Sequence, residues 1–193
     1  MHIAVEGFDG VGKSTAAKKL AEILGFMLVE KPLHYLFDIE GNEQYIRIRD
    51  AVNKSKNKQF TGWFYGLGNI YLYERFKGKN IITDRHILSN YCWSGAPETD
   101  YIFDAIYNTV GAPDFTFLIS ASPDVIEKRM KKRDPGDSDL KKVAYIRTAY
   151  EKMECAFRRY DMPGMIIDTT DLGEDEVVEL MISELKKRGI IDG

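Results

Sequence analysis

Eight residues near the start of the chain place strong limits on its fold. They read Gly7-Phe8-Asp9-Gly10-Val11-Gly12-Lys13-Ser14 and match the pattern G-x-x-x-x-G-K-[ST]. An apolar strand is predicted just before them, at Ile3–Glu6, and a helix just after, at Lys13–Leu24. Glycines let the backbone curl until several N–H groups face one anion, and the start of a helix adds a partial positive charge. The segment therefore predicts a loop that binds the phosphates of a nucleotide.

The side chains of this loop have separate predicted roles. Lys13 supplies a positive charge to the β- and γ-phosphates, and the hydroxyl of Ser14 is a predicted ligand of Mg²⁺. The predicted nucleotide-binding residues are Gly7, Asp9, Gly10, Val11, Gly12, Lys13, Ser14 and Thr15. By itself the loop indicates a nucleoside triphosphate site and leaves the reaction open.

Short apolar strands alternate with helical segments along the rest of the chain. The predicted strands are Ile3–Glu6, Met27–Glu30, Asn80–Thr83, Phe115–Ser120 and Met165–Asp168. Helices are predicted over 13–24, 38–58 and 60–77, in a long segment after Asp139, and in a last segment that begins at Glu174. This alternation is typical of a parallel sheet with helices on both faces. We expect an α/β fold in one domain, residues 1–193, because the length suits a single domain.

Composition narrows the functional classes. With 27 Lys and Arg against 30 Asp and Glu, the formal charge is −3, which disfavours nucleic-acid binding by bulk charge. The two cysteines, Cys92 and Cys155, have no metal-site or disulfide-framework spacing. The chain has no apolar run long enough to span a membrane and no basic, cleavable leader. We therefore expect a cytoplasmic protein with no membrane partner.

Three segments resemble the thymidylate kinase family. The first, Glu6-Gly7-Phe8-Asp9-Gly10-Val11-Gly12-Lys13-Ser14-Thr15, is similar to that family's E-G-x-D-G-x-G-K-[ST]-T opening. The second, Asp84-Arg85-His86-Ile87-Leu88-Ser89 followed by Gly95, is similar to D-R-[YH]-x-x-S…G. The third runs from Pro113-Asp114 to Leu118 and continues at Pro123-Asp124, similar to P-D-x-x-x-x-L-x-x-x-P-E. Their order and spacing match from residue 2 to about 188.

The resemblance implies a P-loop NTPase fold with a five-stranded parallel sheet, a mobile lid and a homodimer. It implies phosphoryl transfer from ATP–Mg²⁺ to a deoxynucleoside monophosphate, with dTMP as the expected acceptor. Asp9 would approach the 3′-hydroxyl of the acceptor's sugar, and Arg85 would hold its phosphate. Asp84 would lie near Mg²⁺ and the transferring group, so Ser14 and Asp84 are the predicted metal residues.

A basic segment follows the fourth predicted strand. It includes Lys128-Arg129-Met130-Lys131-Lys132-Arg133 and ends at Asp134-Pro135-Gly136, where a hinge is predicted. We expect a lid over about residues 129–140. Arginines that arrive on closure stabilise the charge of a transferring phosphoryl group. Because the loop lacks an arginine, Arg129 and Arg133 are expected to supply that charge. The predicted catalytic residues are Lys13, Asp84, Arg85, Arg129 and Arg133.

The acceptor's base requires a flat apolar wall and a few hydrogen bonds. The aromatic segment from Phe60 to Asn69 lies where the resemblance places a base-stacking phenylalanine, so Phe64 is predicted to stack, with Trp63 as the second choice. Asn69 stands near the place where family members often carry an arginine. The predicted acceptor-binding residues are Asp9, Phe64, Arg85 and Tyr91.

Two other functions remain open on the sequence. One is a deoxynucleoside kinase that phosphorylates a 5′-hydroxyl. Such enzymes tend to carry Glu-Arg-Ser where this chain has Asp84-Arg85-His86, which favours a monophosphate acceptor. The other is a regulatory P-loop ATPase. The length of 193 residues, without an appended module, and the basic lid both disfavour it.

Overall fold

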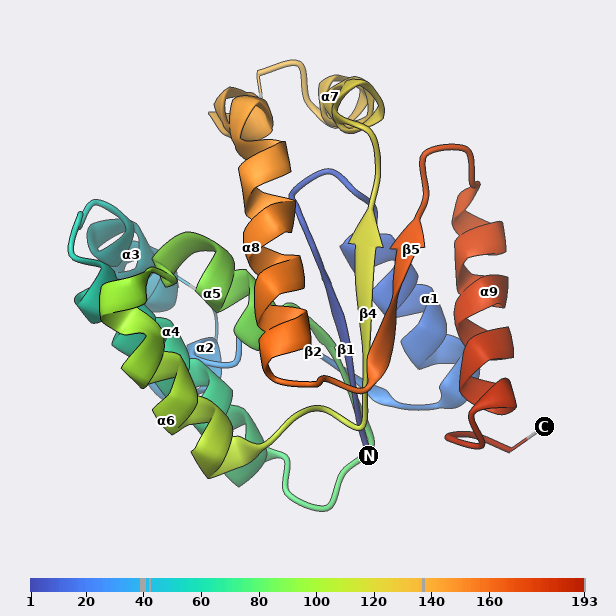
Figure 1. Ribbon diagram of the computed structural model, residues 1–193, viewed down its shortest axis with the longest axis horizontal. Helices are drawn as coiled ribbons and strands as arrows, with labels where there is room; N and C mark the ends of the chain where they lie inside the picture. Colours follow the sequence, from blue (N-terminus) through green and yellow to red (C-terminus); the bar gives the residue numbers. More distant parts are fainter. Residues whose placement is uncertain (39–40, 42, 137, 193) are drawn as a thin grey trace.

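Parallel strands form the centre of the molecule. The computed structural model describes residues 1–38, 41, 43–136 and 138–192. Within them, five strands form one sheet in the order β2-β3-β1-β4-β5 (Figure 1). The strands are β1 (His2–Gly7), β2 (Met27–Glu30), β3 (Ile81–Asp84), β4 (Phe115–Ser120) and β5 (Gly164–Asp168). All five predicted strands are confirmed, each to within one residue at either end.

Helices cover both faces of the sheet, as Figure 1 shows. On one side lie α1 (Lys13–Leu24) and α9 (Glu174–Lys187), which pack against each other. On the other side lie α4 (Lys58–Arg75), α5 (Ile87–Ser94), α6 (Asp100–Val110) and α8 (Ile146–Arg159). Two further helices, α2 (His34–Phe37) and α3 (Glu43–Asn53), lie near α4. The expected α/β class is confirmed.

Strand β1 lies between β3 and β4, and all six of its residues are buried. Its register pairs Val5 with Asp84 on one side and Gly7 with Ile119 on the other. The carboxyl ends of β1, β3 and β4 therefore meet at one edge of the sheet. Open parallel sheets bind ligands at such an edge, where the connections turn to opposite faces.

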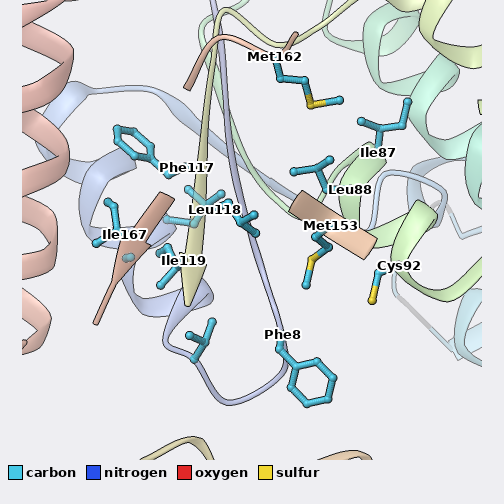
Figure 2. Close-up of a cluster of buried hydrophobic side chains, with 14 of the residues drawn as sticks. Phe8, Ile87, Leu88, Cys92, Phe117, Leu118, Ile119, Met153, Met162 and Ile167 are labelled. Carbon is cyan, nitrogen blue, oxygen red and sulfur yellow. The ribbon is translucent and has the colours of Figure 1, made fainter. Parts of the chain in front are cut away.

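The main hydrophobic core anchors the loop after β1. Phe8 of that loop is almost fully buried, and its ring lies 5.9 Å from that of Trp93, between centroids. Figure 2 shows Phe8 in the same cluster as Cys92 of α5 and Met153 of α8. Burial of this phenylalanine holds the loop in place, because pulling it out would expose a large apolar side chain.

Three predicted helices differ from the structure. In the described part of segment 38–58, which leaves out residues 39, 40 and 42, the structure has α3 and the first residue of α4. The segment 60–77 is α4, which begins at Lys58 because the side chain of Asn57 caps it. The long helix predicted after Asp139 begins only at Ile146, and a 3₁₀ helix, η2 (Ser138–Tyr145), precedes it.

The glycines within α4 have a packing reason. A Cβ at Gly66 would lie 2.4 Å from Cδ1 of Ile106 in α6. Glycine therefore lets α4 and α6 approach closely, and this close contact compensates for the lower helix propensity.

Candidate active site

The loop between β1 and α1 has the backbone shape that anion binding requires. Gly7 has φ 145°, and a Cβ there would lie 2.3 Å from the carbonyl oxygen of Ile119. Gly10 has φ 80°, and its Cβ would collide with Met130 of helix α7 (Pro123–Arg133). Both positions require glycine for conformation and for space.

Lys13 is folded back into this loop. Its Nζ atom donates to the carbonyl oxygen of Phe8 over 2.6 Å, and the side chain is buried. Burial, followed by the charge of Arg85, lowers the pKa of Lys13 to about 8. A buried ammonium with one carbonyl partner has donors left for an incoming phosphate. The position suits the phosphate-binding role predicted for Lys13, which stays a prediction.

A tyrosine that the sequence did not single out holds the loop from the side of α8. The hydroxyl of Tyr150 donates to the carbonyl oxygen of Ile119 over 2.8 Å and accepts from the backbone N–H of Phe8 at 3.3 Å. Helical spacing indicates only that Tyr150 faces inward. Its contact with a loop 142 residues away in sequence depends on the tertiary structure.

The two predicted metal residues touch each other. Ser14 Oγ donates to Asp84 Oδ2 over 2.5 Å, while Asp84 Oδ1 is buried with no hydrogen-bond partner. A hydroxyl beside a carboxylate with an unsatisfied oxygen fits Mg²⁺, which takes one or two protein ligands and completes its shell with phosphates and water. In the described part of the chain, no group of three or more His, Cys, Asp or Glu side chains could hold a metal by itself.

Arg85 directly follows Asp84 and reaches back toward the loop. Its Nη2 atom forms an ion pair with Asp9, and its Nη1 atom donates to Ser89 Oγ at 3.1 Å and to the carbonyl oxygen of Gly7 at 3.4 Å. Burial by itself would raise the pKa of the Asp9 carboxyl, but the charges of Arg85, Lys13 and Lys142 bring it below the ordinary value. Two of the four predicted acceptor-binding residues, Asp9 and Arg85, therefore lie together at the phosphate loop.

A cleft of about 760 Å³ opens beside these charges. Asp9, Asp84 and Arg85 line the part nearest the loop. The remaining walls include Tyr45, Tyr65, Asn69, His86, Asn90 and Trp93. The volume suits a small-molecule ligand, and the lining joins aromatic rings with a few polar groups.

Phe64 does not line this cleft, contrary to prediction. Its ring stacks on Phe37, with centroids 6.2 Å apart and planes 5° apart. The second choice, Trp63, is 43% exposed and has its ring edge against Tyr101. Each residue turns an α-helix by about 100°, so the cleft receives the next side chain, Tyr65.

Tyr91 is also absent from the cleft. Its hydroxyl donates to Asp100 Oδ1 at 2.9 Å, and its ring edge meets Phe103 of α6 in the core. The residues of α5 that reach the cleft include Asn90 and Trp93. Tyr91 therefore lies on the core face of α5, and its predicted contact with the acceptor has no support from the lining of this cleft.

Unsatisfied polar atoms gather on the cleft wall. Asn69 Oδ1, Asn90 Oδ1 and both ring nitrogens of His86 are buried without a hydrogen-bond partner. Asn90 Nδ2 donates to the carbonyl oxygen of Gly62 at 3.1 Å, which fixes Oδ1 as the free acceptor. Burial keeps the pKa of His86 well below its ordinary value. A buried polar atom without a hydrogen-bond partner lowers the stability of the fold, and a ligand that pairs with it removes that penalty.

The two predicted lid arginines lie in different surroundings. Arg129 donates to the carbonyl oxygens of Val11 and Thr169 at 3.2 and 2.8 Å, so it joins the phosphate loop to the segment after β5. Arg133 ends α7, and its charge helps to lower the pKa of Asp9. Asp137, within the predicted lid, lies outside the described residues.

Sequence reasoning missed Lys142, which lies in η2. Its Nζ atom lies 2.7 Å from Asp139 and 3.7 Å from Asp9, and 5.3 Å from the centre of the Trp93 ring. A continuous helix was predicted there, and the 3₁₀ geometry changes the direction of each side chain. The signal available in the sequence was one lysine close to the basic segment.

Comparison with known proteins agrees with this arrangement. The family model described as Thymidylate kinase matches residues 68–181. The thymidylate kinase of Lactobacillus acidophilus is 25% identical over 211 residues, which cover 96% of this chain and 94% of that protein. The thymidylate kinase of Rickettsia rickettsii is 25% identical over 197 residues, covering 95% and 96%. This chain belongs to the thymidylate kinase family.

Solved structures show the same fold as this thymidylate kinase family member. A deoxyadenosine kinase from M. mycoides, with products dCMP and a flexible dCDP bound, has a TM-score of 0.68 at 22% identity. That alignment covers 97% of this chain and 100% of the other. The thymidylate kinase of Candida albicans has a TM-score of 0.72 at 16% identity, covering 97% and 92%.

Family membership establishes the class of reaction. The protein is a nucleoside monophosphate kinase that uses ATP, as the three sequence segments implied. No helix in the described ranges is long and apolar enough to cross a membrane. The roles of individual site residues stay predictions.

Proposed function

We propose that this kinase transfers the γ-phosphoryl group of Mg²⁺–ATP to the phosphate of dTMP and forms dTDP. The position of Arg85 carries the proposal, because its guanidinium contacts both Asp9 and the carbonyl oxygen of Gly7 in the phosphate loop. A planar guanidinium binds the oxygens of a monophosphate through two parallel bonds. An acceptor phosphate held there would face the end of ATP bound by the loop.

The loop would bind the donor. Backbone N–H groups and Lys13 would hold the β- and γ-phosphates, and Lys13 would exchange its bond to Phe8 for bonds to phosphate oxygens. Ser14 and Asp84 would hold Mg²⁺, which would neutralise part of the phosphate charge. The protein's contribution is mainly positioning and electrostatic stabilisation.

Positive charge from the lid would complete the site. Arg133 and Lys142 already act on Asp9 electrostatically. On closure, these two side chains would bring their positive charge to the transferring group. Arg129 has carbonyl partners on both sides of the donor end, so its proposed task is to link the loop and lid while ATP is bound.

The polar wall of the cleft supports recognition of thymine. Thymine offers one N–H donor flanked by two carbonyl acceptors. The fixed Oδ1 of Asn90 accepts from such an N–H, and the Asn69 amide carries both a donor and an acceptor. Tyr65 and Trp93 supply aromatic surfaces against which the base would pack.

A homodimer also belongs to the proposal. Phe60, Trp63 and Leu67 follow one another at helical spacing on α4, and each is at least two-fifths exposed. Large apolar side chains in a row on one helix face are typical of a surface that another protein covers. Replacement of Leu67 by glutamate should therefore halve the mass measured by sedimentation, while an unchanged mass would exclude this face. A cytoplasmic location likewise stays an expectation.

The test is an acceptor panel. The purified protein is incubated with Mg²⁺–ATP and with dTMP, dCMP, dAMP, dGMP or thymidine, and the phosphorylated products are separated. We expect dTDP, with a kcat/KM for dTMP at least about tenfold above that for the other acceptors. The Lys13→Ala variant, prepared in parallel, controls for contaminating kinases.

Three outcomes would contradict the proposal. Formation of dTMP from thymidine as the main activity would identify a deoxynucleoside kinase. ATP hydrolysis without a phosphorylated acceptor would identify a regulatory ATPase. Preference for a different monophosphate would retain the reaction and overturn the assignment of the base.

A further inference from the structure

A buried carboxylate lies directly beneath the candidate active site. Glu6, the last residue before Gly7 on β1, is fully buried. Its Oε1 atom accepts from the backbone N–H groups of His86 and Leu88 at 2.9 and 2.8 Å. Its Oε2 atom accepts from Ser89 Oγ at 2.5 Å. The backbone N–H of Ser89 lies 3.3 and 3.2 Å from the two oxygens.

These partners all donate to Glu6. An ionised carboxylate accepts hydrogen bonds and donates none, so the arrangement matches the charged form. Burial raises the pKa of Glu6, whereas donation from Ser89 and the charge of Arg85 oppose that rise. The carboxylate also lies at the start of α5, where unpaired N–H groups attract negative charge.

The same contacts hold an uncommon backbone turn. Arg85 has φ 79°, in the left-handed region that non-glycine residues seldom adopt. The strand ladder fixes one side of the turn, because the N–H of Arg85 donates to the carbonyl oxygen of Val5 at 2.9 Å. Glu6 fixes the other side through His86 and Leu88. Strained residues persist where their surroundings hold them firmly.

Ser89 connects Glu6 to the guanidinium of Arg85. Its hydroxyl gives its only proton to Glu6 and uses a lone pair to accept from Arg85 Nη1 at 3.1 Å. If the carboxylate were absent, this hydroxyl would be free to rotate and would lose its fixed acceptor direction. The chain of contacts therefore runs from Glu6 through Ser89 to Arg85, and then to Asp9.

We propose that Glu6 is a positioning residue for the acceptor phosphate: through Ser89 it sets the direction in which Arg85 presents its guanidinium. The proposal rests on the role of Arg85 in the proposed function. It gives Glu6 a task beyond capping α5, because orientation of a guanidinium affects acceptor binding and a cap affects only stability. A misplacement of about 1 Å in such a group costs up to about a hundredfold in rate.

The decisive variant is Ser89→Ala. It leaves the Glu6 carboxylate and its bonds to the backbone of α5 intact, and it removes the connection to Arg85. We expect the KM for dTMP to rise about tenfold or more while the KM for ATP changes less than about twofold. Ser89→Thr restores a hydroxyl at this position and should recover most of the lost affinity. Glu6→Gln should resemble Ser89→Ala, because an amide nitrogen cannot accept the Ser89 proton.

Thr99→Ala provides the matched control. Its buried hydroxyl also has hydrogen bonds around α5, donating to the carbonyl oxygen of Ser94 and accepting from the N–H of Ala96. This variant should lower the melting temperature without a selective change in the KM for dTMP. It separates loss of a buried hydroxyl from loss of guanidinium orientation.

A double-mutant comparison completes the test. In an Arg85→Ala background, Ser89→Ala should cause no further rise in the KM for dTMP, because the group that it orients is gone. Full additivity of the two changes would overturn the proposal, as would equal effects of Ser89→Ala on dTMP and ATP. If Arg85→Ala itself leaves the KM for dTMP unchanged, the proposed function of Arg85 fails instead. Failure of Glu6→Gln to fold would leave the Ser89 and Arg85 results decisive.

Discussion

Arg85 and Asp9 form an ion pair across the wall of the cleft, one from the turn after β3 and the other from the phosphate loop. Each is therefore held by the other while no ligand is bound. A monophosphate that reaches Arg85 competes with the Asp9 carboxylate for the same donors. A ligand that also offers a hydroxyl to Asp9 gives that carboxylate a new partner, so a sugar and a phosphate together can replace the pair.

Arg85→Ala should weaken the acceptor far more than ATP. Two charge-assisted hydrogen bonds contribute about 3 kcal/mol, so we expect the KM for dTMP to rise about a hundredfold. The KM for ATP should change only a few-fold. Initial rates over a matrix of both substrates measure the two constants. A rise confined to the KM for ATP would assign Arg85 to the donor.

Lys13→Ala should abolish turnover. Loss of this charge from the phosphate loop should lower kcat by about a thousandfold, which is several kcal/mol of transition-state stabilisation. The variant also frees the carbonyl oxygen of Phe8, which accepts a hydrogen bond from Lys13. A thermal unfolding curve shows whether the fold persists. A well-folded variant with wild-type turnover would remove the loop from the mechanism.

Binding of ATP should take up a proton above neutral pH. Burial lowers the pKa of Lys13 to about 8, so part of the free enzyme has a neutral Lys13 at pH 8.5. Phosphate oxygens favour the ammonium, and binding should therefore take up a large fraction of a proton at pH 8.5 and almost none at pH 6.5.

Calorimetry in two buffers of different ionisation enthalpy measures this uptake. Lys13→Met, which keeps an unbranched side chain one atom shorter and lacks the amine, serves as the control and should show no rise in uptake between the two pH values. An equal rise in the variant would assign the proton to another group.

Asp84→Asn should raise the concentration of Mg²⁺ needed for half-maximal activity by about tenfold or more, because an amide oxygen is a weaker ligand than a carboxylate. The Oδ1 atom of Asp84 has no hydrogen-bond partner in the protein, so the fold loses little when an amide replaces the carboxylate. A titration of activity with Mg²⁺ at fixed ATP gives the constant. An unchanged Mg²⁺ requirement would exclude Asp84 from the metal site.

The lid arginines should affect the chemical step. We expect Arg133→Ala to slow single-turnover phosphoryl transfer by about a hundredfold with small changes in substrate affinity. Arg129→Ala should slow the same step and also weaken ATP binding, because it removes the bonds to the carbonyl oxygens of Val11 and Thr169. Lys131→Ala is the matched control, since Lys131 lies on α7 in an exposed pair with Glu127 at 2.5 Å. It should leave the rate nearly unchanged.

The outcome of this series identifies the source of the charge. If both arginine variants keep the wild-type single-turnover rate, the charge comes from elsewhere, and Lys142 beside Asp9 is the next candidate.

Local sequence patterns were sufficient to predict the five strands of the sheet and the glycine-rich loop after the first of them. A strand, a glycine-rich turn and a helix start follow one another in Ile3–Leu24, and each is specified by neighbouring residues. Asp84 and Arg85 could be assigned to the same edge because parallel strands carry their carboxyl ends to one side. The family resemblance rested on three segments, which lie at the end of β1, at the end of β3 and along β4.

Tertiary structure alone decided which side chains line the cleft. Phe64 and Tyr65 differ by one position, yet the first stacks on Phe37 and the second lines the cleft. Tyr91 and Asn90 differ in the same way on α5. A rotation of about 100° per residue decides each case, and the exact rotation depends on how α4, α5 and α6 pack together.

The sequence by itself determined the backbone shape of the loop between β1 and α1, because the residues that form it are consecutive and their conformation follows from their own types. It did not determine the partners of Glu6, Lys142 or Tyr150. Glu6 and Ser89 are 83 positions apart, and Tyr150 and Phe8 are 142 apart. Such pairs form only when the sheet has brought β1, β3 and α8 together, since a hydrogen bond depends on direction and distance that no local pattern specifies.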